Sequence, residues 1–336
     1  MLRGAFIGFG NVAVKGHLPG WRSRSDVRIV AATDDVAARR EAFLAECPDG
    51  RWYDSVDDLL SGETLDFVDV CTPPGSHATL IKRALDAGLH ILCEKPLVTR
   101  MGDAQTVAAA AASAARVVYT VHNWLKAPIC LQISALIAEG AIGAVRSVRW
   151  RTLRTQPAVA ATADGGKNWR VDPALAGGGI LFDHGWHALY CIVRWAGAPQ
   201  GVAALLETRR FHEWPLEDTA TLNLDLPFGG GHIYLTWTAS ERSNLIEIEG
   251  ERGHISVVDD NVIVRSNGDE RRWACPPPLS EGSHHPDWFS GVAEDFLMAV
   301  MGGGKGNLDE AVLCARLIEL AQRSGAAGGA WLSLGD

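Results

Sequence analysis

A glycine motif near the start of the chain constrains the fold of the first third of the protein more than any other feature. Residues 2–7 (LRGAFI) form an apolar run that leads directly into GFGNVA, in which Gly8, Gly10 and Ala13 have the spacing G-x-G-x-x-A. Behind a strand and ahead of a helix, this spacing is typical of dinucleotide binding, because the glycines permit a tight turn and a close approach of pyrophosphate to the backbone. The residues that we expect at the dinucleotide are Gly8, Phe9, Gly10, Asn11 and Val12.

The runs that follow predict further strands. Residues 27–33 (VRIVAAT), 66–71 (DFVDVC) and 89–93 (LHILC) are short and mostly apolar. The helix-like stretch IKRALDAG, which ends at Gly88, precedes the last of them, and a glycine just past a helix is a usual stop. Short apolar runs separated by helices indicate a parallel sheet of βαβ units, so we predict a Rossmann domain.

Asp34 bears on the choice of cofactor, since it stands at the end of the second predicted strand. A carboxylate there accepts hydrogen bonds from a ribose 2′-hydroxyl and repels a 2′-phosphate, so the sequence favours NAD over NADP. The alternative is that Asp34 caps the next helix and that Asp35 faces the ribose or solvent. NADP therefore stays open as a second cofactor.

Length and composition limit the class of protein. A chain of 336 residues is longer than one hydrophobic core usually serves, so we expect two domains. The formal net charge of -9 argues against nucleic acid as a partner, because nucleic-acid binding needs a basic face. We expect no membrane segment, because there is no run of about 18 apolar residues, and glycines interrupt the only signal-like run. Seven cysteines without paired C-x-x-C spacing favour reduced thiols and a cytoplasmic location.

Beyond residue 123 the apolar period changes from that of helices to that of strands. Alternating polar and apolar residues predict half-buried strands, and FGGG at residues 228–231 has the composition of a hairpin turn. The predicted strands cover about residues 144–152, 202–210, 219–226, 232–239, 245–249 and 262–265.

Several longer motifs occur in a recognisable order. They are the TP-x-x-x-H segment Thr72–His77, the EKP triplet Glu94–Pro96, WRVDPALAGGGILFDHGWH at residues 169–187 and NLDEAVLCARLIELAQRS at residues 307–324. With these motifs the chain resembles, over essentially its whole length, the glucose-fructose oxidoreductase and inositol dehydrogenase family (Gfo/Idh/MocA).

The resemblance implies an α/β plus α+β fold. Residues 1–122 would form the Rossmann NAD(P)-binding domain, and residues 123–336 would form an α+β domain with a large, open, mostly antiparallel sheet. In this family the sheet commonly makes the subunit contact, so the resemblance implies a homodimer or homotetramer. The helix near residues 307–324 resembles one that often closes family members, and it could pack back on the N-terminal domain.

The resemblance also assigns catalytic residues. Lys95 of the EKP triplet would lie beside the nicotinamide, and Asp183 and His187 match a D-x-x-x-H motif. Oxidising a secondary alcohol needs a hydride acceptor, a base for the hydroxyl proton and positive charge near the developing alkoxide. His187 is the candidate base because a histidine pKa of about 6.5 is closest to neutrality, Lys95 would stabilise the alkoxide, and Asp183 would orient the hydroxyl or the lysine. Considered alone, an Asp/His pair four apart on a helix also fits a plain surface hydrogen bond.

Other site residues follow from the same resemblance. The expected cofactor contacts beyond the glycine loop are Asp34, Thr72, Pro73, His77, Glu94, Lys95, Trp169 and Arg170. The expected substrate contacts are Lys95, Asn123, Trp169, Asp183 and His187. Lys126 stands where many relatives have arginine, which leaves the substrate class open, as does the unassigned His284. Trp124, Trp169 and Trp186 suggest stacking on a sugar, although tryptophan is also common in cores.

We predict no metal site. Asp183, His184 and His187 could suggest one, but adjacent positions on a helix point about 100 degrees apart, so the three side chains should not converge. His184 is therefore expected to be a bystander, and Gly177 to Gly179 should permit close passage of the nicotinamide or of the neighbouring domain.

The function that combines these features is an NAD-dependent dehydrogenase acting on a secondary hydroxyl of a sugar, inositol or related polyol. An NAD(P)H-dependent reductase of a keto-sugar or imine is the alternative within redox chemistry. Alternatives of another class are an NAD-assisted glycosidase and a non-catalytic dinucleotide-sensing protein.

Overall fold

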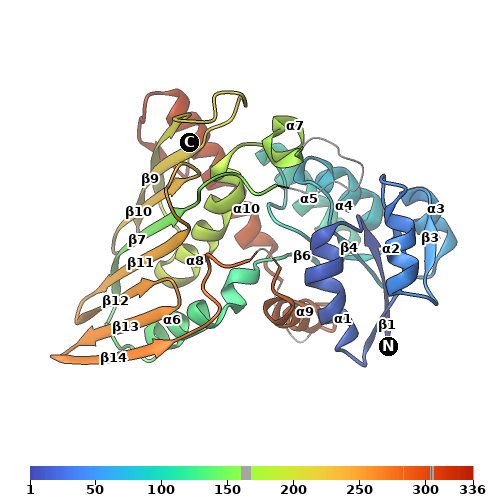
Figure 1. The fold of residues 1–336 in the computed structure, drawn as a ribbon, viewed down its shortest axis with the longest axis horizontal. Coiled ribbons are helices and arrows are strands. Elements are labelled where there is room, and N and C mark those ends of the chain that lie inside the picture. Colours follow the sequence, from blue (N-terminus) through green and yellow to red (C-terminus); the bar gives the residue numbers. More distant parts are fainter. Residues whose placement is uncertain (160–167, 283, 303, 305, 336) are drawn as a thin grey trace. The chain divides into compact units, whose positions relative to one another are not determined.

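The computed structural model describes residues 1–159, 168–282, 284–302, 304 and 306–335, and its contacts divide the chain into two compact units. Unit 1 comprises the described residues of Met1–Asn123, Val159–Trp169 and Ser283–Val312. Unit 2 comprises Trp124–Ala158, Arg170–Gly282 and the described residues of Leu313–Asp336. Figure 1 shows the ribbon of the chain, in which each unit contains one sheet. Among the described residues, no helix is both long and apolar enough to cross a membrane.

Unit 1 is built on a six-stranded sheet in the order β3-β2-β1-β4-β5-β6, and all its neighbouring pairs are parallel. This confirms the Rossmann prediction. The order reverses between β1 and β4, and ligands of open parallel sheets bind outside the carboxyl ends of the strands at such a reversal. The strands are β1 (Leu2–Ile7), β2 (Val27–Thr33), β3 (Arg51–Tyr53), β4 (Phe67–Val70), β5 (His90–Cys93) and β6 (Val118–Thr120).

Helices of unit 1 connect and cover these strands (Figure 1). Gly88 has a φ of +77° just after α4, as the stop predicted there requires. The helical segments are η1 (Ala13–His17), α1 (Leu18–Arg22), α2 (Arg39–Glu46), α3 (Val56–Gly62), η2 (Pro74–Ser76), α4 (His77–Asp86), α5 (Met101–Ala114) and α9 (Pro286–Val300).

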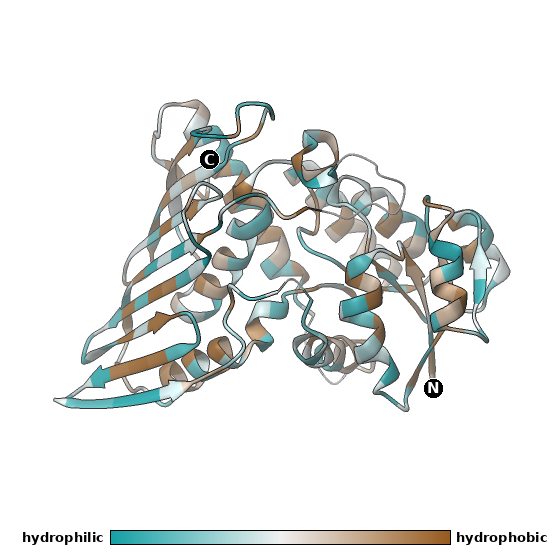
Figure 2. Cartoon of the chain, viewed as in Figure 1, coloured by the Kyte–Doolittle hydropathy of each residue, from teal (hydrophilic) through white to brown (hydrophobic). Residues whose placement is uncertain are grey.

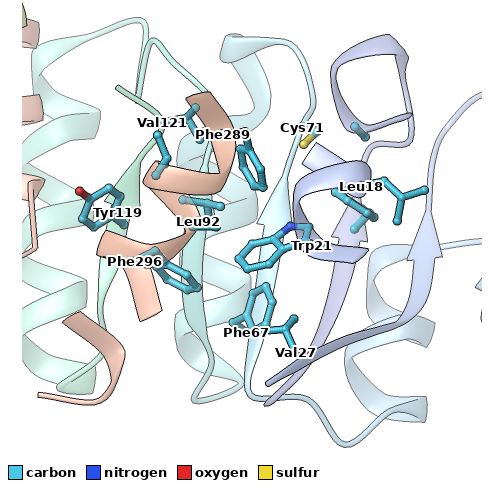
Figure 3. Close-up of a cluster of buried hydrophobic side chains, with 14 of the residues drawn as sticks. Leu18, Trp21, Val27, Phe67, Cys71, Leu92, Tyr119, Val121, Phe289 and Phe296 are labelled. Carbon is cyan, nitrogen blue, oxygen red and sulfur yellow. The ribbon is translucent and has the colours of Figure 1, made fainter. Parts of the chain in front are cut away.

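Helix α9 contributes to the core of unit 1 although it lies far along the chain. Figure 3 shows Phe289 and Phe296 of α9 among the buried side chains of the N-terminal segment. The Trp21 ring lies 5.3 Å from the Phe289 ring, and the Phe67 ring lies 5.4 Å from the Phe296 ring. The apolar core of unit 1 therefore depends on a segment near the other end of the sequence. The boundary between residues 122 and 123 stays a prediction.

Unit 2 contains a nine-stranded sheet in the order β14-β13-β12-β11-β7-β10-β9-β8-β15. Only β7 and β10 pair in parallel, and the other neighbouring pairs are antiparallel, which confirms the mostly antiparallel sheet. The strands are β7 (Val145–Leu153), β8 (Gly201–Glu207), β9 (Thr219–Leu226), β10 (Gly229–Thr236), β11 (Ser243–Gly250), β12 (Gly253–Val258), β13 (Asn261–Ser266), β14 (Asp269–Ala274) and β15 (Leu332–Ser333).

The helices of unit 2 lie on one face of this sheet (Figure 1). Buried and exposed residues alternate along the strands, so that in β7 Trp150 is buried whereas Arg149 and Arg151 are exposed. Figure 2 shows this alternation as successive brown and teal segments. Three helical segments start in unit 1 and continue into unit 2, namely η3 (Asn123–Lys126), η4 (Trp169–Val171) and α10 (Leu308–Ala326). The helical segments wholly in unit 2 are α6 (Pro128–Ala138), α7 (Pro173–Ala176), η5 (Leu181–Gly185) and α8 (Trp186–Ala196).

The predicted FGGG turn is wrong in its position. Strand β9 ends at Leu226 and β10 begins at Gly229, so the turn is Pro227–Phe228 and the three glycines belong to the strand. A Cβ on Gly229 would lie 1.7 Å from the Arg146 carbonyl oxygen. The glycine is therefore needed because the backbone at the start of β7 passes very close to it.

Candidate functional site

The glycine loop lies at the carboxyl end of β1. Gly8 has a φ of +90°, and a Cβ there would lie 2.9 Å from the Cys71 carbonyl carbon, so both the turn and the neighbouring chain require glycine. A Cβ on Gly10 would meet nothing within 4 Å. Gly10 therefore borders open space on the side where a pyrophosphate would approach the backbone, and the loop fits a dinucleotide. The Phe9 ring is fully buried, which leaves only its backbone for a ligand.

Asp34 is held against this loop at the end of β2. One of its carboxylate oxygens accepts the Phe9 N–H at 2.6 Å, and the other accepts the Val36 N–H at 2.8 Å. Helix α2 begins only at Arg39, with Ala38 as its N-cap. The alternative in which Asp34 caps this helix is therefore wrong, because the carboxylate closes the preceding turn and faces the glycine loop instead.

The segment after β4 carries Thr72, Pro73 and His77. The imidazole of His77 is fully buried, with Nδ1 2.9 Å from the Pro96 carbonyl oxygen and Nε2 2.9 Å from that of Thr72. Burial lowers the pKa of His77, so the ring is neutral and its single N–H can donate to only one of these two carbonyl oxygens, while the other nitrogen packs against the second. Any effect of the His77 side chain on a cofactor is thus exerted through the backbone that it supports.

Glu94 and Lys95 follow β5, at the same edge of the sheet. One Glu94 oxygen accepts the Lys95 N–H at 2.9 Å, and the other lies 3.0 Å from Nε2 of His17. Burial raises the pKa of Glu94, but the hydrogen bond and charge of His17 together with those of Lys95 outweigh burial and hold that pKa below its usual range. The sequence contained no motif that singled out His17, which is an ordinary-looking residue of the helix after the glycine loop.

Asp183 belongs to unit 2 and lies in the π-helix η5, just before α8. Its Oδ2 lies 3.1 Å from Nδ1 of His184. The wider π-turn and the freedom of the two side chains thus bring adjacent residues together, and the expectation that His184 is a bystander in catalysis stays a prediction. Asp183 also contributes to the electrostatic environment of the buried Arg154, whose pKa burial lowers to about 10.

Close packing explains the glycines before this segment. A Cβ on Gly179 would lie 1.9 Å from the Glu217 carbonyl oxygen. That carbonyl also accepts the Ile180 N–H at 3.1 Å, and the Glu217 side chain accepts the Leu181 N–H at 3.0 Å. The backbone that passes Gly179 is thus that of Glu217 in the same unit, where the sequence had suggested the nicotinamide or the other domain.

His187, in the first turn of α8, is oriented by two aromatic residues. Its Nδ1 lies 2.6 Å from the Tyr190 hydroxyl oxygen, which also accepts the Trp124 N–H at 3.1 Å. The Trp124 and His187 rings are stacked at 4.2 Å with an interplanar angle of 10°. His187 is 5% exposed and Tyr190 is fully buried. In the tautomer whose Nδ1–H donates to the Tyr190 oxygen, Nε2 is the ring nitrogen that can accept a proton from a ligand.

Two of the three tryptophans predicted to stack on a sugar are buried in the core of unit 2. Trp124 is 6% exposed and lies between His187 and Trp150, and Trp186 is fully buried. Both are therefore packing residues. Trp169 and Arg170 are half-buried in η4, and Asn123, Lys126 and His284 are half-buried in their segments.

The predicted site residues fall into two groups. Unit 1 brings the glycine loop, Asp34 and the Glu94–Lys95 segment to the carboxyl ends of its strands, and Asp183 and His187 lie within one turn of each other in unit 2. One buried group of ligand-type atoms, from His17, Asp69 and Cys71, was not predicted. Tyr190 was also missed, although its place three residues after His187, on the same helix face, was visible in the sequence.

Two family models match the chain. One is described as an oxidoreductase family with an NAD-binding Rossmann fold and matches residues 2–122, and the other is described as the GFO/IDH/MocA C-terminal domain and matches residues 130–256. D-apiose dehydrogenase of Paraburkholderia graminis is 28% identical over 84% of this chain and 74% of its own length. The chain spans between 64% and 74% of the length of three curated relatives.

Solved structures of similar fold cover both units. An oxidoreductase from Agrobacterium radiobacter in complex with NAD+, L-tartaric acid and magnesium has a TM-score of 0.86 at 22% identity, covering 99% of this chain and 98% of that one. A levoglucosan dehydrogenase in complex with NADH and levoglucosan also has a TM-score of 0.86, at 19% identity, and covers 100% of both chains. At these identities the likeness establishes the fold.

Proposed function

Because the chain belongs to the GFO/IDH/MocA family of NAD-binding oxidoreductases, we propose that it is an NAD-dependent dehydrogenase that oxidises a secondary hydroxyl of a sugar or related polyol. The observation that carries the proposal is the buried His187, held at Nδ1 by Tyr190 so that Nε2 can take a proton. The names of relatives that act on D-apiose and levoglucosan support a sugar substrate.

The residues around the glycine loop suit NAD. Gly10 leaves room at the backbone, and the Asp34 carboxylate, held by the Phe9 N–H, has further lone pairs for ribose hydroxyls. The same carboxylate would repel a 2′-phosphate, which favours NAD over NADP. When bound, NAD supplies the acceptor for the hydride that leaves the carbinol carbon.

The remaining chemistry is assigned to His187, Lys95 and Asp183, with Tyr190 orienting the His187 ring. His187 accepts the hydroxyl proton at Nε2, and Tyr190 keeps the ring in the required orientation. The Lys95 ammonium group stabilises the developing alkoxide. Asp183 orients the hydroxyl or Lys95, and its Oδ2 lies 3.1 Å from Nδ1 of His184. The mechanism requires Lys95 and His187 to act on one substrate molecule.

Assembly and compartment are part of the proposal. We propose that a second copy binds the face of the unit 2 sheet opposite its helices, giving a homodimer or homotetramer, because side chains such as Arg149, Arg151 and Glu247 are exposed there. Sedimentation as a monomer at micromolar concentration would contradict this. All seven cysteines lie in the described part of the chain and none of them forms a disulfide there, which suits the reducing cytoplasm that we propose as the location.

The experiment that tests the function is a panel of sugars, inositols and sugar acids with NAD+ or NADP+, followed by absorbance of the reduced cofactor. We expect turnover with at least one sugar or polyol and a preference for NAD+. Reduction of a keto-sugar or imine without any alcohol oxidation would favour the reductase. Release of an aglycone without net NADH would favour a glycosidase. NADH binding with no turnover at all would favour a sensor.

A further inference from the structure

His17 is a buried histidine between two carboxylates in unit 1. It ends η1, the helical turn that follows the glycine loop, and is 2% exposed. Its Nδ1 lies 2.9 Å and 3.1 Å from the two carboxylate oxygens of Asp69, on β4, and its Nε2 lies 3.0 Å from Oε1 of Glu94, after β5. One imidazole thus connects the helical turn after the glycine loop with β4 and with the residue that follows β5.

The geometry is that of a charged imidazole. A neutral ring carries one N–H and could donate to only one of the two carboxylates, while its other nitrogen would face an oxygen lone pair. With both nitrogens protonated, both contacts are hydrogen bonds. Burial alone would lower the pKa of His17, but Asp69 and Glu94 together raise it to about 9.

The other groups around the ring complete this arrangement. The Trp21 Nε1–H donates to Asp69 at 2.8 Å, and the Cys71 thiol lies 3.4 Å from the same carboxylate. The Phe289 ring from α9 stacks on His17 at 3.9 Å. Among the described residues, the ionisable side chains that contact the His17 ring are thus Asp69, Glu94 and Cys71.

We propose that His17, as an imidazolium, is a positioning residue of the dinucleotide site that holds Glu94 inside unit 1 and thereby places the backbone of Lys95. The second Glu94 oxygen accepts the Lys95 N–H at 2.9 Å, so the link runs from the helix after the glycine loop to the residue assigned to the alkoxide. The inference rests on dinucleotide binding within the proposed function and is independent of the substrate.

A bound metal is the competing explanation of this cluster. Ligand atoms of His17, Asp69 and Cys71 lie within 4.8 Å of one another. A metal would need a Cys71 thiolate, however, and burial together with Asp69 raises the pKa of that thiol well above its usual value. The His17 contacts also have the lengths of N–H···O hydrogen bonds.

Two measurements on the full-length protein test the charge state. In ¹⁵N-labelled protein, comparison with H17Q assigns the His17 ring among the 11 histidines. We expect both ring nitrogens to be protonated at pH 7.5, with deprotonation near pH 9. A neutral ring at pH 7.5, or a stoichiometric metal in elemental analysis that H17Q lacks, would overturn the proposal.

Binding of NADH, measured by calorimetry, tests the positioning role. H17Q should weaken NADH binding by roughly tenfold or more, the scale of a lost charge-assisted hydrogen bond. W21F is the matched control: it removes a donor to the same Asp69 carboxylate but leaves Glu94 bound, and it should change the affinity by less than about twofold. E94Q keeps the shape and removes the charge, so it should behave like H17Q and replaces it if H17Q does not fold.

The outcomes separate this inference from the function on which it rests. Wild-type affinity in both H17Q and E94Q, or equal weakening in W21F, would overturn the positioning role. Failure of the unmodified protein to bind NADH would instead refute the proposed function, while the nitrogen spectrum would still decide whether His17 is charged.

Discussion

Replacing Tyr190 by Phe removes a single oxygen atom from the buried side of His187. The hydroxyl is 2.6 Å from Nδ1 of His187 and accepts the Trp124 N–H, so the substitution breaks two hydrogen bonds. Tyr190 is fully buried, and the ring of Phe fills the same space, so water should not replace the oxygen. A buried polar group left without its partner costs about 1–3 kcal/mol, and we expect Y190F to lower the free energy of unfolding by about that amount.

The same loss should appear in catalysis. Without Tyr190, stacking on Trp124 still fixes the plane of the His187 ring, but no hydroxyl selects which nitrogen faces the substrate. If the transition state loses about 1.4 kcal/mol of stabilisation because the His187 ring is no longer oriented, kcat falls about tenfold.

A second variant, Y190E, tests the charge of this partner. The Tyr190 side chain is a neutral phenol, so replacing it with the carboxylate of Glu should raise the pKa of His187 and move the acid limb of kcat/KM to higher pH.

The assay is steady-state NADH formation across pH, with urea unfolding of each variant. Y234F is a matched control, because Tyr234 on β10 is half-buried and its hydroxyl lies 3.4 Å from Arg209, in a pair that plays no part in the mechanism. Y190F with wild-type kcat and an unchanged pH profile would refute the orienting role. A loss of stability without a loss of kcat would show that the hydroxyl serves only the fold.

Four further predictions follow from the same contacts. K95A and H187A should each reduce turnover by about a hundredfold or more, the scale of acid-base catalysis. H187A should also lower the unfolding midpoint, because it removes a buried ring that contacts the Tyr190 hydroxyl. Near-normal rates in both variants would exclude the mechanism. D34S should shift the ratio of NAD+ to NADP+ affinities toward NADP+ in calorimetry, since it removes the charge at the ribose, and an unchanged ratio would argue against a ribose contact. G10A should weaken NADH binding without changing the unfolding midpoint. G8A should weaken NADH binding and also lower the unfolding midpoint, because of the two glycines only Gly8 has a positive φ and a crowded Cβ position. Equal stability of the two variants would contradict this. The pKa of His17 is raised from 6.5 to about 9 in the folded protein, so its contribution to stability, about 3 kcal/mol, is fully present below pH 6.5 and is lost as pH rises through 9. Urea unfolding of wild type and H17Q at pH 6.5 and 9.5 should show a larger difference at the lower pH.

The features that the sequence predicted correctly depend on neighbours a few residues apart. The glycine loop could be identified because the turn at Gly8 and the open approach at Gly10 each exclude a side chain. The unit 2 strands could be located where one face is apolar, as in β9. Strand β14, with the sequence DERRWA, was missed because it is an exposed edge strand and has no apolar face to alternate.

Site residues that act through distant partners could not be found in this way. His17 and Asp69 are 52 positions apart, and His17 and Glu94 are 77 apart, so no local period links them. A histidine on a helix looks the same in the sequence whether its ring is in solvent or between two buried carboxylates. Its chemistry depends on burial, and burial here is produced by the packing of α9, whose Phe289 covers the ring. The motif residues Lys95 and His187 were identified by family resemblance, whereas the residues that orient them, His17 and Tyr190, required the fold. If His17 and Tyr190 position the reacting groups as proposed, substituting either one should impair function although Lys95 and His187 are unchanged. A His17 variant should then change the affinity for NADH, and a Tyr190 variant should change kcat and its pH dependence.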